Sequence, residues 1–401
     1  MKIIRIPALA LSLAAIAGCV HQEVITINAT PAQAAVADVA DEMLLDVGVT
    51  IFEANVPEDI KEQNKSRLVA GVRNAEARYM PYVLRDTLAG TGQWGAVRVL
   101  PRGSETVDLV IGARIETSDG EMLVLTVTAR DATGRVWLDE REYEDLAGKL
   151  NYREDIATTK QDPFQDLYNR IANDLLAVRE GLSTRDLVRV REVAQLRFAA
   201  DVAPGAFGDY LEHEDGRIRA TRLPARGDPM LERVEKIRER DYLFIDTLDQ
   251  HYGAFYHQVR GAYSDWRRFN YDEVVELRRL EREIRRRTIA GAALIVGGLA
   301  VDASSDSEYA SYAGQVGALV GLSTILSTFP MRPEALVHAE TMRELGDTFE
   351  AEVRPAVLEV DGKTITLTGS VDSQFEQWRD LLREIYTTET GLPEVSGPAA
   401  N

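Results

Sequence analysis

A single cysteine, Cys19, is the feature that most limits what this 401-residue chain can fold into. With one thiol the chain cannot form an internal disulfide, so its fold must be stable through the burial of apolar side chains alone. The composition allows this, because 45% of the residues are hydrophobic. The length predicts two or three domains, and the hydrophobic content excludes a chain that is disordered throughout.

The residues before Cys19 have the organisation of a secretory signal. Lys2 and Arg5 form a short positive region, and residues 6–16 form an apolar stretch that is too short to span a membrane. We therefore expect residues 1–18 to be a signal peptide that is removed from the mature protein.

The apolar stretch ends in Ile16-Ala17-Gly18-Cys19, which resembles the lipobox of bacterial lipoproteins. The resemblance implies that the Cys19 thiol is lipidated and that acyl chains such as palmitate anchor the protein. Val20 and His21 follow, with no aspartate in the position that marks inner-membrane retention, so the resemblance implies the periplasmic face of the outer membrane. An ordinary cleaved signal beside an incidental cysteine is the alternative.

The charge of the chain limits its partners. It carries 65 acidic and 46 basic residues, a formal net charge of −19 with histidine neutral. A surface this negative repels nucleic acid. We expect the partners to be a membrane, through the lipid on Cys19, and envelope proteins or peptidoglycan.

The first half of the chain predicts a tether followed by a small domain. Residues 19–44 lack a core-forming period at their start and are expected to be a lipidated tether and lead-in, whereas residues 45–182 alternate strand and helix patterns and predict a small α/β domain. The expected elements are strands at 47–52, 96–100 and 108–116, a helix at 67–88, a hairpin of strands 122–130 and 135–143, and a helix that Asp162 caps and Gly181 ends.

Two short motifs in this domain carry a resemblance. The run Asp108–Ile115, which contains Gly112, and the turn Thr133-Gly134-Arg135-Val136-Trp137 resemble the α/β domain of several outer-membrane lipoproteins. These are the penicillin-binding-protein activator lipoproteins, the curli secretion-channel lipoprotein and the amino-terminal domain of the Tol-Pal translocation protein. The likeness covers residues 46–178 and implies a binding and assembly module without catalytic residues.

Residues 183–330 predict a long helical region. Ser183 and Asp186 are expected to cap its first helix, residues 203–227 to form a loop, and Asp228 to cap a long helix, while Asn270 with Glu273 is expected to start another. The two long helices would then pack as a hairpin. An apolar stripe on the first of them is expected to be core, and it consists of Ile237, Phe244, Leu248, Tyr252, Phe255, Val259, Tyr263 and Trp266.

Two apolar segments, 288–301 and 312–329, predict a second helical hairpin within residues 288–329. Small residues recur at every fourth position, a spacing that lets helices approach closely. We expect a helix-packing or oligomer interface there, in a possible homo-oligomer, and the alternative is a hairpin that enters a membrane. The small residues are Ala293, Gly297, Ala313, Gly317 and Gly321.

Residues 331–390 predict a small hairpin and helix module, followed by a flexible tail at 391–401. Leu336, Leu345 and Phe349 are expected to line its first helix, and an apolar stripe from Phe375 to Ile385 its last. The stretch 357–371, with its Asp361-Gly362 turn, resembles the core of a BON domain, an envelope module associated with phospholipid or outer-membrane binding. The final strand of such a domain is missing here.

The sequence contains no convincing catalytic, cofactor or metal motif, although a pair of catalytic carboxylates stays open because geometry defines such pairs. Gly90–Gly95 matches a dinucleotide fingerprint as a string but follows a helix, the reverse of what phosphate binding needs. Gly362-Lys363-Thr364 lies in a hairpin turn. His251 and His257 fall on different faces of a helix, and residues 302–308 lack a calcium-loop pattern.

Together these patterns predict an α+β protein: a small amino-terminal α/β domain, a long helical middle with a glycine-spaced helical hairpin, and a small carboxyl-terminal hairpin and helix module. The function expected is that of a lipid-anchored binding or scaffold protein, accessory to an envelope machine for peptidoglycan synthesis or surface-polymer export. The alternative is a membrane-inserting or pore-forming assembly through residues 288–329, and a cell-wall hydrolase is the third possibility.

Overall fold

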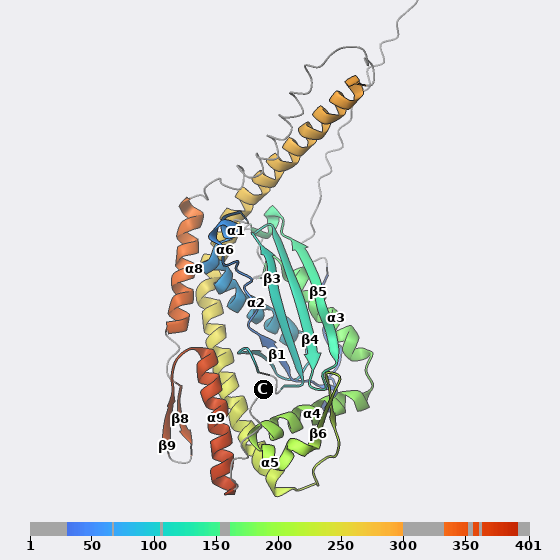
Figure 1. Ribbon diagram of the computed structural model, residues 1–401, viewed down its shortest axis with the longest axis vertical. Coiled ribbons are helices and arrows are strands. Elements are labelled where there is room, and N and C mark those ends of the chain that lie inside the picture. The colour runs from blue at the N-terminus through green and yellow to red at the C-terminus, as the bar shows by residue number, and fades with distance from the viewer. Residues whose placement is uncertain are drawn as a thin grey trace, which may run out of the picture.

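The computed structural model describes residues 30–65, 68–104, 107–152, 161–299, 333–351, 356–360 and 363–391, and its fold is α+β, as predicted (Figure 1). In chain order the elements are η1 (Asp41–Met43), β1 (Val47–Thr50), α1 (Ile60–Lys65), α2 (Ala70–Gly90), β2 (Val97–Leu100), β3 (Leu109–Ser118), β4 (Met122–Asp131), β5 (Val136–Leu146), η2 (Lys149–Tyr152), α3 (Gln165–Glu180), α4 (Thr184–Val202), α5 (Pro204–Phe207), η3 (Gly208–Tyr210), β6 (Leu211–Glu214), β7 (Arg217–Ala220), α6 (Pro229–Leu299), α8 (Pro333–Ala351), β8 (Ala356–Val360), β9 (Lys363–Leu367) and α9 (Val371–Thr390).

A five-stranded sheet forms the amino-terminal half, with strand order β2-β1-β3-β4-β5. β1 runs parallel to β2 and β3, and β3, β4 and β5 form an antiparallel meander. α2 and α3 cover one face. Leu125 and Val127 of β4 are buried, whereas Thr128 and Glu142 are exposed, which is the alternation expected of a sheet covered on one side.

The helix α6 packs against β2, the strand at one edge of the five-stranded sheet. The edge strand β2 places the backbone N–H of Val99 against Asp249, whose Oδ1 accepts it at 2.7 Å. Arg98 of the same strand pairs with Asp246 one turn earlier on α6, and Arg85 of α2 pairs with Asp249 at 2.8 Å. α6 therefore provides a hydrogen-bond partner for the Val99 N–H and covers an edge strand that could otherwise pair with another chain.

α6 is one continuous helix of 71 residues, about 105 Å long at 1.5 Å per residue. Asp228 caps it as predicted, accepting the backbone N–H of Met230 at 2.9 Å. The predicted helix start at Asn270 and the packed pair of helices are wrong. Asn270 lies inside the helix, and its Nδ2 donates to the Asp119 carbonyl in the β3–β4 turn at 2.6 Å. The cap-like spacing of Asn270 and Glu273 is equally compatible with a helix interior.

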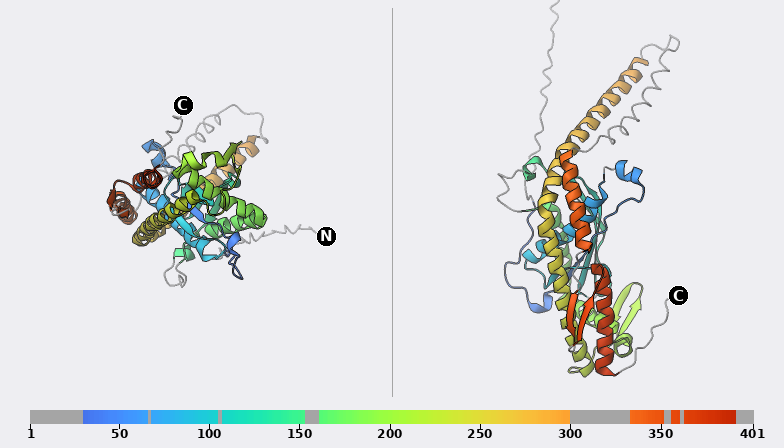
Figure 2. Two further views of the ribbon diagram at one scale, coloured as in Figure 1. Left: turned by 90° about the horizontal axis from the view of Figure 1, so that it is seen from below. Right: turned by 90° about the vertical axis from the view of Figure 1, so that its left-hand side faces the viewer.

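The aromatic stripe of α6 is core, as predicted, and every member from Ile237 to Trp266 is buried. Figure 2 shows α8 and α9 lying along the same helix. The buried side chains of the sheet, α2, α3, α4, α6, α8 and α9 form one contiguous hydrophobic cluster. The predicted units therefore share one core within the part of the chain that the structure describes.

Of three local predictions in this region, two change and one is confirmed. The helix expected directly after Asp162 begins at Gln165, because Asp162 caps the turn before it by accepting the N–H of Phe164 at 3.0 Å. Ser183 and Asp186 form the predicted capping box of α4. Residues 203–227, predicted to be a loop, contain α5, η3 and the β6–β7 hairpin, which is held to the sheet by the Ile218 N–H donating to the Thr133 carbonyl at 2.9 Å.

The amino-terminal lead-in packs on the folded body from Thr30 onward, although its composition predicted a tether there. The N–H of Thr30 donates to Asp166, and the N–H of Gln33 donates to Asn173 at 2.8 Å, both on α3. The side-chain amides of Asn169 and Asn173 in turn donate to the carbonyls of Thr30 and Pro31. The chain therefore lies on α3 from Thr30 onward.

The carboxyl-terminal module is a two-stranded β8–β9 hairpin followed by α9. The apolar stripe of α9, from Phe375 to Ile385, is buried as predicted. Leu336 is exposed, contrary to prediction, because α8 packs through Ala339 and Met342 instead. Up to Gly391, where the described chain ends, no strand follows α9, consistent with the missing strand noted in the sequence.

Part of the predicted 288–329 hairpin is described. The helix α6 runs unbroken through residues 288–299, and in Figure 1 its last part, in orange, extends beyond the sheet. Residues 300–332 lie outside the described residues. Within the described chain, no helix combines the length and hydropathy required to cross a membrane.

Candidate functional site

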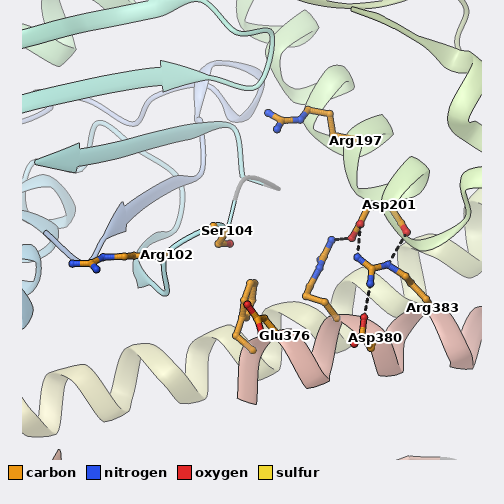
Figure 3. Close-up of a pocket in the computed structure, with 10 residues that line it drawn as sticks. Arg102, Ser104, Arg197, Asp201, Glu376, Asp380 and Arg383 are labelled. Atoms are coloured by element: carbon orange, nitrogen blue, oxygen red, sulfur yellow. Dashed lines mark hydrogen bonds and ion pairs between the residues drawn. The ribbon is translucent and has the colours of Figure 1, made fainter. Parts of the chain in front are cut away.

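A pocket of about 380 Å³ lies between α4, α9 and the loop that follows β2 (Figure 3). Four of the ten residues that line it are arginines, and we call it the arginine pocket. Its lining is Arg102, Gly103, Ser104, Arg197, Asp201, Phe375, Glu376, Arg379, Asp380 and Arg383.

The helix α9 builds one wall through its helical repeat. Phe375, Arg379 and Arg383 recur at every fourth residue and so share a face. On the neighbouring face of α9, Trp378 packs against Phe244 of α6, with ring centroids 5.0 Å apart. The Trp378 indole N–H donates to Asp241 of α6 at 3.0 Å. The buried side of α9 therefore fixes the angle at which its arginines enter the pocket.

Asp201 of α4 holds two of these arginines in place. Its carboxylate accepts from Arg379 and, at 2.8 Å, from Arg383 (Figure 3). Arg383 also pairs with Asp380, one turn earlier on α9, at 2.6 Å. These contacts join α4 to α9 and orient the guanidinium groups before any ligand arrives.

Two buried donors of the pocket have no hydrogen-bond partner among the residues that the structure describes. They are the hydroxyl of Ser104, whose residue is 2% exposed, and Nη1 of Arg379. That nitrogen lies 3.6 Å from Oδ2 of Asp241, which is close enough for an ion pair but too far for a hydrogen bond. Since the guanidinium can only donate and the hydroxyl can also donate, a ligand with acceptor atoms satisfies both groups.

The electrostatics favour a negatively charged ligand. Burial, and then the neighbouring Arg383, lower the pKa of Arg379 to about 10. Burial raises the pKa of Asp241 to about 7, although Trp378 donates to its carboxylate. Near neutral pH Asp241 is then only partly ionised, so Asp201 is the main counter-charge of Arg379, and an added anion would supply a second one.

The charges of the residues that line the pocket also favour an anionic ligand. Four arginines face three carboxylates, those of Asp201, Glu376 and Asp380, although the chain as a whole carries −19. Arg102 donates to the Phe52 carbonyl at 2.7 Å and forms no ion pair within the described chain. A locally positive pocket on an acidic protein attracts anions that the rest of the surface repels.

The residues singled out from sequence lie elsewhere. Cys19, Ala313, Gly317 and Gly321 fall outside the described residues. Ala293 and Gly297 lie on the last turns of α6, four residues apart on one continuous helix. The structure brings none of the described ones to the arginine pocket.

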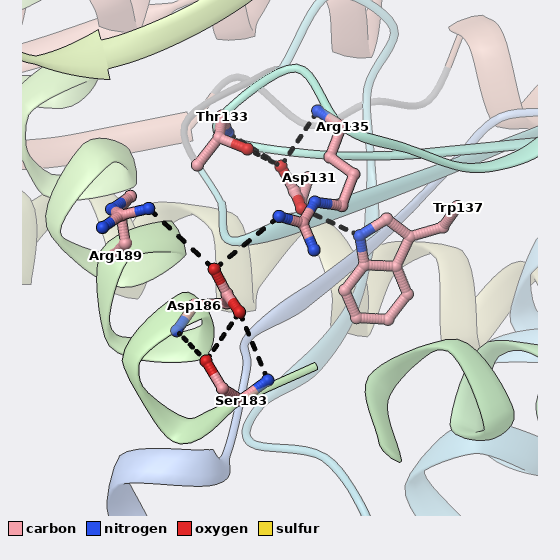
Figure 4. Close-up of polar contacts among 7 residues, drawn as sticks. All are labelled: Asp131, Thr133, Arg135, Trp137, Ser183, Asp186 and Arg189. Atoms are coloured by element: carbon pink, nitrogen blue, oxygen red, sulfur yellow. Dashed lines mark hydrogen bonds and ion pairs between the residues drawn. The ribbon is translucent and has the colours of Figure 1, made fainter. Parts of the chain in front are cut away.

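The Thr133–Trp137 turn has a structural explanation (Figure 4). Oδ1 of Asp131 accepts from the N–H and the hydroxyl of Thr133, and Oδ2 accepts from the Trp137 indole at 2.9 Å. Gly134 has a φ of 75°, and a Cβ there would meet the Gly216 carbonyl oxygen. The motif closes the β4–β5 turn against the β6–β7 hairpin.

The glycine string Gly90–Gly95, His251 and His257 all lie outside the arginine pocket. Gly90 ends α2, and the chain then enters β2, so the glycine string precedes a strand and not a helix. His257 stacks edge-on against Tyr256, with ring centroids 5.2 Å apart, and burial lowers the pKa of His251. In the described part of the chain, no three histidine, cysteine or carboxylate side chains gather in a way that would hold a metal ion.

Sequence reasoning missed the arginine pocket because its residues come from three distant segments. Arg102 follows β2, Arg197 lies on α4 and Arg379 on α9. The one local signal was the spacing of Arg379 and Arg383 beside the apolar stripe of α9, and such spacing is also common on solvated helices. Their convergence depends on the packing of α9 against α6.

No protein family model, curated protein or solved structure matches this chain. The likeness of residues 46–178 to envelope lipoprotein domains, and of residues 357–371 to a BON core, therefore stays a prediction.

Proposed function

We propose that this protein is a lipid-anchored binding protein of the outer-membrane periplasmic face, accessory to an envelope machine, and that it captures an anionic group of its partner in the arginine pocket. The observation that carries the binding part is the pair of buried, unpartnered donors on Ser104 and Arg379 within a locally positive cavity. The partner class is an envelope protein or peptidoglycan, both of which carry carboxylates.

The contact of Thr30 with α3 limits the length of chain between a lipid on Cys19 and the folded body. Thr30 is hydrogen-bonded to α3, and it follows Cys19 by eleven residues. At about 3.3–3.6 Å per residue, even a fully extended segment of that length spans no more than about 40 Å. A lipid on Cys19 would therefore hold the α3 side of the body close to the membrane.

The anchor is tested by replacing Cys19 with serine, which removes the only thiol in the chain. We expect Cys19→Ser protein to incorporate no labelled palmitate and to leave the membrane fraction, while the wild-type chain incorporates label and stays with it. Palmitate incorporation by the serine variant would contradict lipidation at this residue.

A membrane-inserting assembly is the second candidate, and one observation favours it. α6 continues without a break from the core into the apolar residues 288–299, beyond the sheet. The Cys19→Ser chain separates the two candidates because it has no lipid. A binding protein should leave a dye trapped in phospholipid vesicles, whereas a pore should release it, and release that deletion of residues 288–329 abolishes would favour the pore.

Anion capture is tested with inorganic phosphate as the probe in titration calorimetry of the Cys19→Ser chain. Ser104→Ala removes a buried donor that has no partner, so the fold should not be destabilised. A hydrogen bond to a charged ligand contributes about 1.5–3 kcal/mol, so phosphate binding should weaken about tenfold or more. Arg102→Gln should weaken it to a similar extent.

The matched control is Arg185→Gln, which removes one positive charge from an exposed position at the start of α4. It should leave the phosphate affinity unchanged. Equal binding by wild type, Ser104→Ala and Arg102→Gln would rule out the arginine pocket as the site. A capture experiment from detergent-solubilised envelopes, with wild type and Ser104→Ala side by side, would then identify the partner that depends on it.

A further inference from the structure

The last part of α6 is strongly basic, although the chain as a whole is acidic. Residues 279–287 hold five arginines and two glutamates, a net charge of +3 on a chain whose net charge is −19. We call residues 279–287 the basic segment. Directly after it, residues 288–301 contain no charged residue. A basic segment followed by an apolar one suits an anionic lipid surface, which attracts the charges and can also take up apolar groups.

The folded body holds α6 at the point where the basic segment begins. Nη2 of Arg278 pairs with Asp119 at 2.6 Å, and the same guanidinium pairs with Glu121, both in the β3–β4 turn. The next residue, Arg279, has a side chain that is 74% exposed, and Arg282 is also exposed. Beyond this turn α6 extends past the sheet (Figures 1 and 2). The helix therefore carries the basic segment away from the acidic body.

The amino-terminal lead-in begins at the same end of the body. Thr30 is hydrogen-bonded to the first turn of α3. Asp162, just before this helix, pairs with Arg267 of α6, and Arg278 follows on α6 about 16 Å further along at 1.5 Å per residue. From Arg278 α6 continues for about 32 Å to its last described residue. Since a lipid on Cys19 would lie within about 40 Å of Thr30, the lipid and the end of α6 can reach the same membrane.

We infer that the basic segment docks on the surface of an anionic phospholipid membrane, attracted by the negative charge of the lipid phosphates. Approach by another, acidic part of the surface is opposed by repulsion, so the charge distribution selects this end of the molecule. The apolar part of α6 that the structure describes, residues 288–299, is about 18 Å long, whereas the hydrocarbon core is about 30 Å thick. The contact is therefore peripheral. The shared membrane rests on the proposed lipid anchor, whereas docking of the basic segment does not.

The test uses the mature chain, residues 19–401, with Cys19→Ser, so that no lipid is attached. Its binding to vesicles of phosphatidylglycerol and of phosphatidylcholine is compared by sedimentation. One basic residue near an anionic surface strengthens binding about fivefold, so we expect binding to phosphatidylglycerol to be at least tenfold stronger. Salt at 1 M, where the screening length is about 3 Å, should remove this preference. Equal binding to both vesicles overturns the inference, and binding to neither also overturns it and leaves an acidic protein as the partner of the segment.

Replacing Arg285, Arg286 and Arg287 together with glutamine should weaken binding to phosphatidylglycerol vesicles about tenfold to a hundredfold, because it cancels the net charge of the basic segment. These positions lie on the part of α6 beyond the sheet, so the fold should be retained, and circular dichroism checks this. Unchanged vesicle binding by the folded variant would contradict docking through this segment.

The matched control replaces Arg219, Arg222 and Arg226 with glutamine, the same change in charge at three exposed positions. They lie in or just after the β6–β7 hairpin, at the other end of the molecule in Figure 1, so vesicle binding should be unchanged. Ser104→Ala should also bind vesicles like its parent, which separates docking from anion capture in the arginine pocket. A loss of vesicle binding in either of these variants as large as that of the 285–287 variant overturns the inference.

Discussion

Replacing Asp162 with alanine is expected to lower the free energy of unfolding by about 3–5 kcal/mol, because it leaves a buried guanidinium without its counter-charge. Nη1 of Arg267 donates to both carboxylate oxygens of Asp162, at 3.1 and 3.0 Å, and the Asp162 and Arg267 side chains are 3% and 4% exposed. Arg267 also lies over the Tyr263 ring, 4.0 Å from its centroid. Burial alone would lower the pKa of Arg267, and Asp162 beside it keeps this pKa well above its ordinary value.

Asp265→Ala provides the matched control on the same helix. It breaks the ion pair with Arg268, whose N···O distance is also 3.0 Å but whose side chains are 38% and 41% exposed. Exposed pairs of this kind contribute about 0.2–1 kcal/mol. Urea unfolding followed by circular dichroism compares the two variants. Similar midpoints for both would mean that Asp162 and Arg267 are solvated in the protein.

Phe244→Ala is expected to cost about 3–5 kcal/mol of unfolding free energy, since it removes a buried ring and leaves a cavity. Phe244 contacts Trp378, so the cavity would open at the joint between α6 and α9. The adjacent Leu243 is 68% exposed, and Leu243→Ala should change the stability by no more than about 0.5 kcal/mol. Thermal unfolding of the pair checks this. An unchanged midpoint for Phe244→Ala would show that the ring does not pack in the core.

These two contacts lie at different points along α6. The Asp162–Arg267 pair lies beside Tyr263, whose hydroxyl donates to the buried Glu76 of α2. The Phe244–Trp378 contact holds α9, whose neighbouring face supplies Arg379 and Arg383 to the arginine pocket. The arginine pocket therefore depends on the packing of α9 against α6.

The elements that the sequence predicted correctly are those with a strong local period or a complete cap. The alternation in 122–143, the 3.6-residue stripe from Ile237 to Trp266 and the capping box of Ser183 and Asp186 are examples. In each example, the residues that make the pattern are the same residues that are buried or that accept the first N–H groups of the helix. Both requirements are local, so the sequence alone shows them.

The elements that it missed depend on partners far along the chain. Asn270 has the residue type and spacing of a cap, but its amide bonds to the Asp119 carbonyl on another element. Leu336 fits a helical period and yet is exposed, because the neighbours of α8 select the face with Ala339 and Met342. The lead-in at Thr30 has no core-forming pattern, and amide side chains of α3 fix its backbone.

The sequence by itself determined the α+β class and the apolar stripe from Ile237 to Trp266, because these follow from the periodicity of residues that must leave water. Only the tertiary structure decided where the arginine pocket is. Ser104 and Arg379 line one pocket because α9 packs against both α6 and α4. A polar group becomes an unpartnered donor or acceptor only when distant segments bury it, and no local pattern records that event.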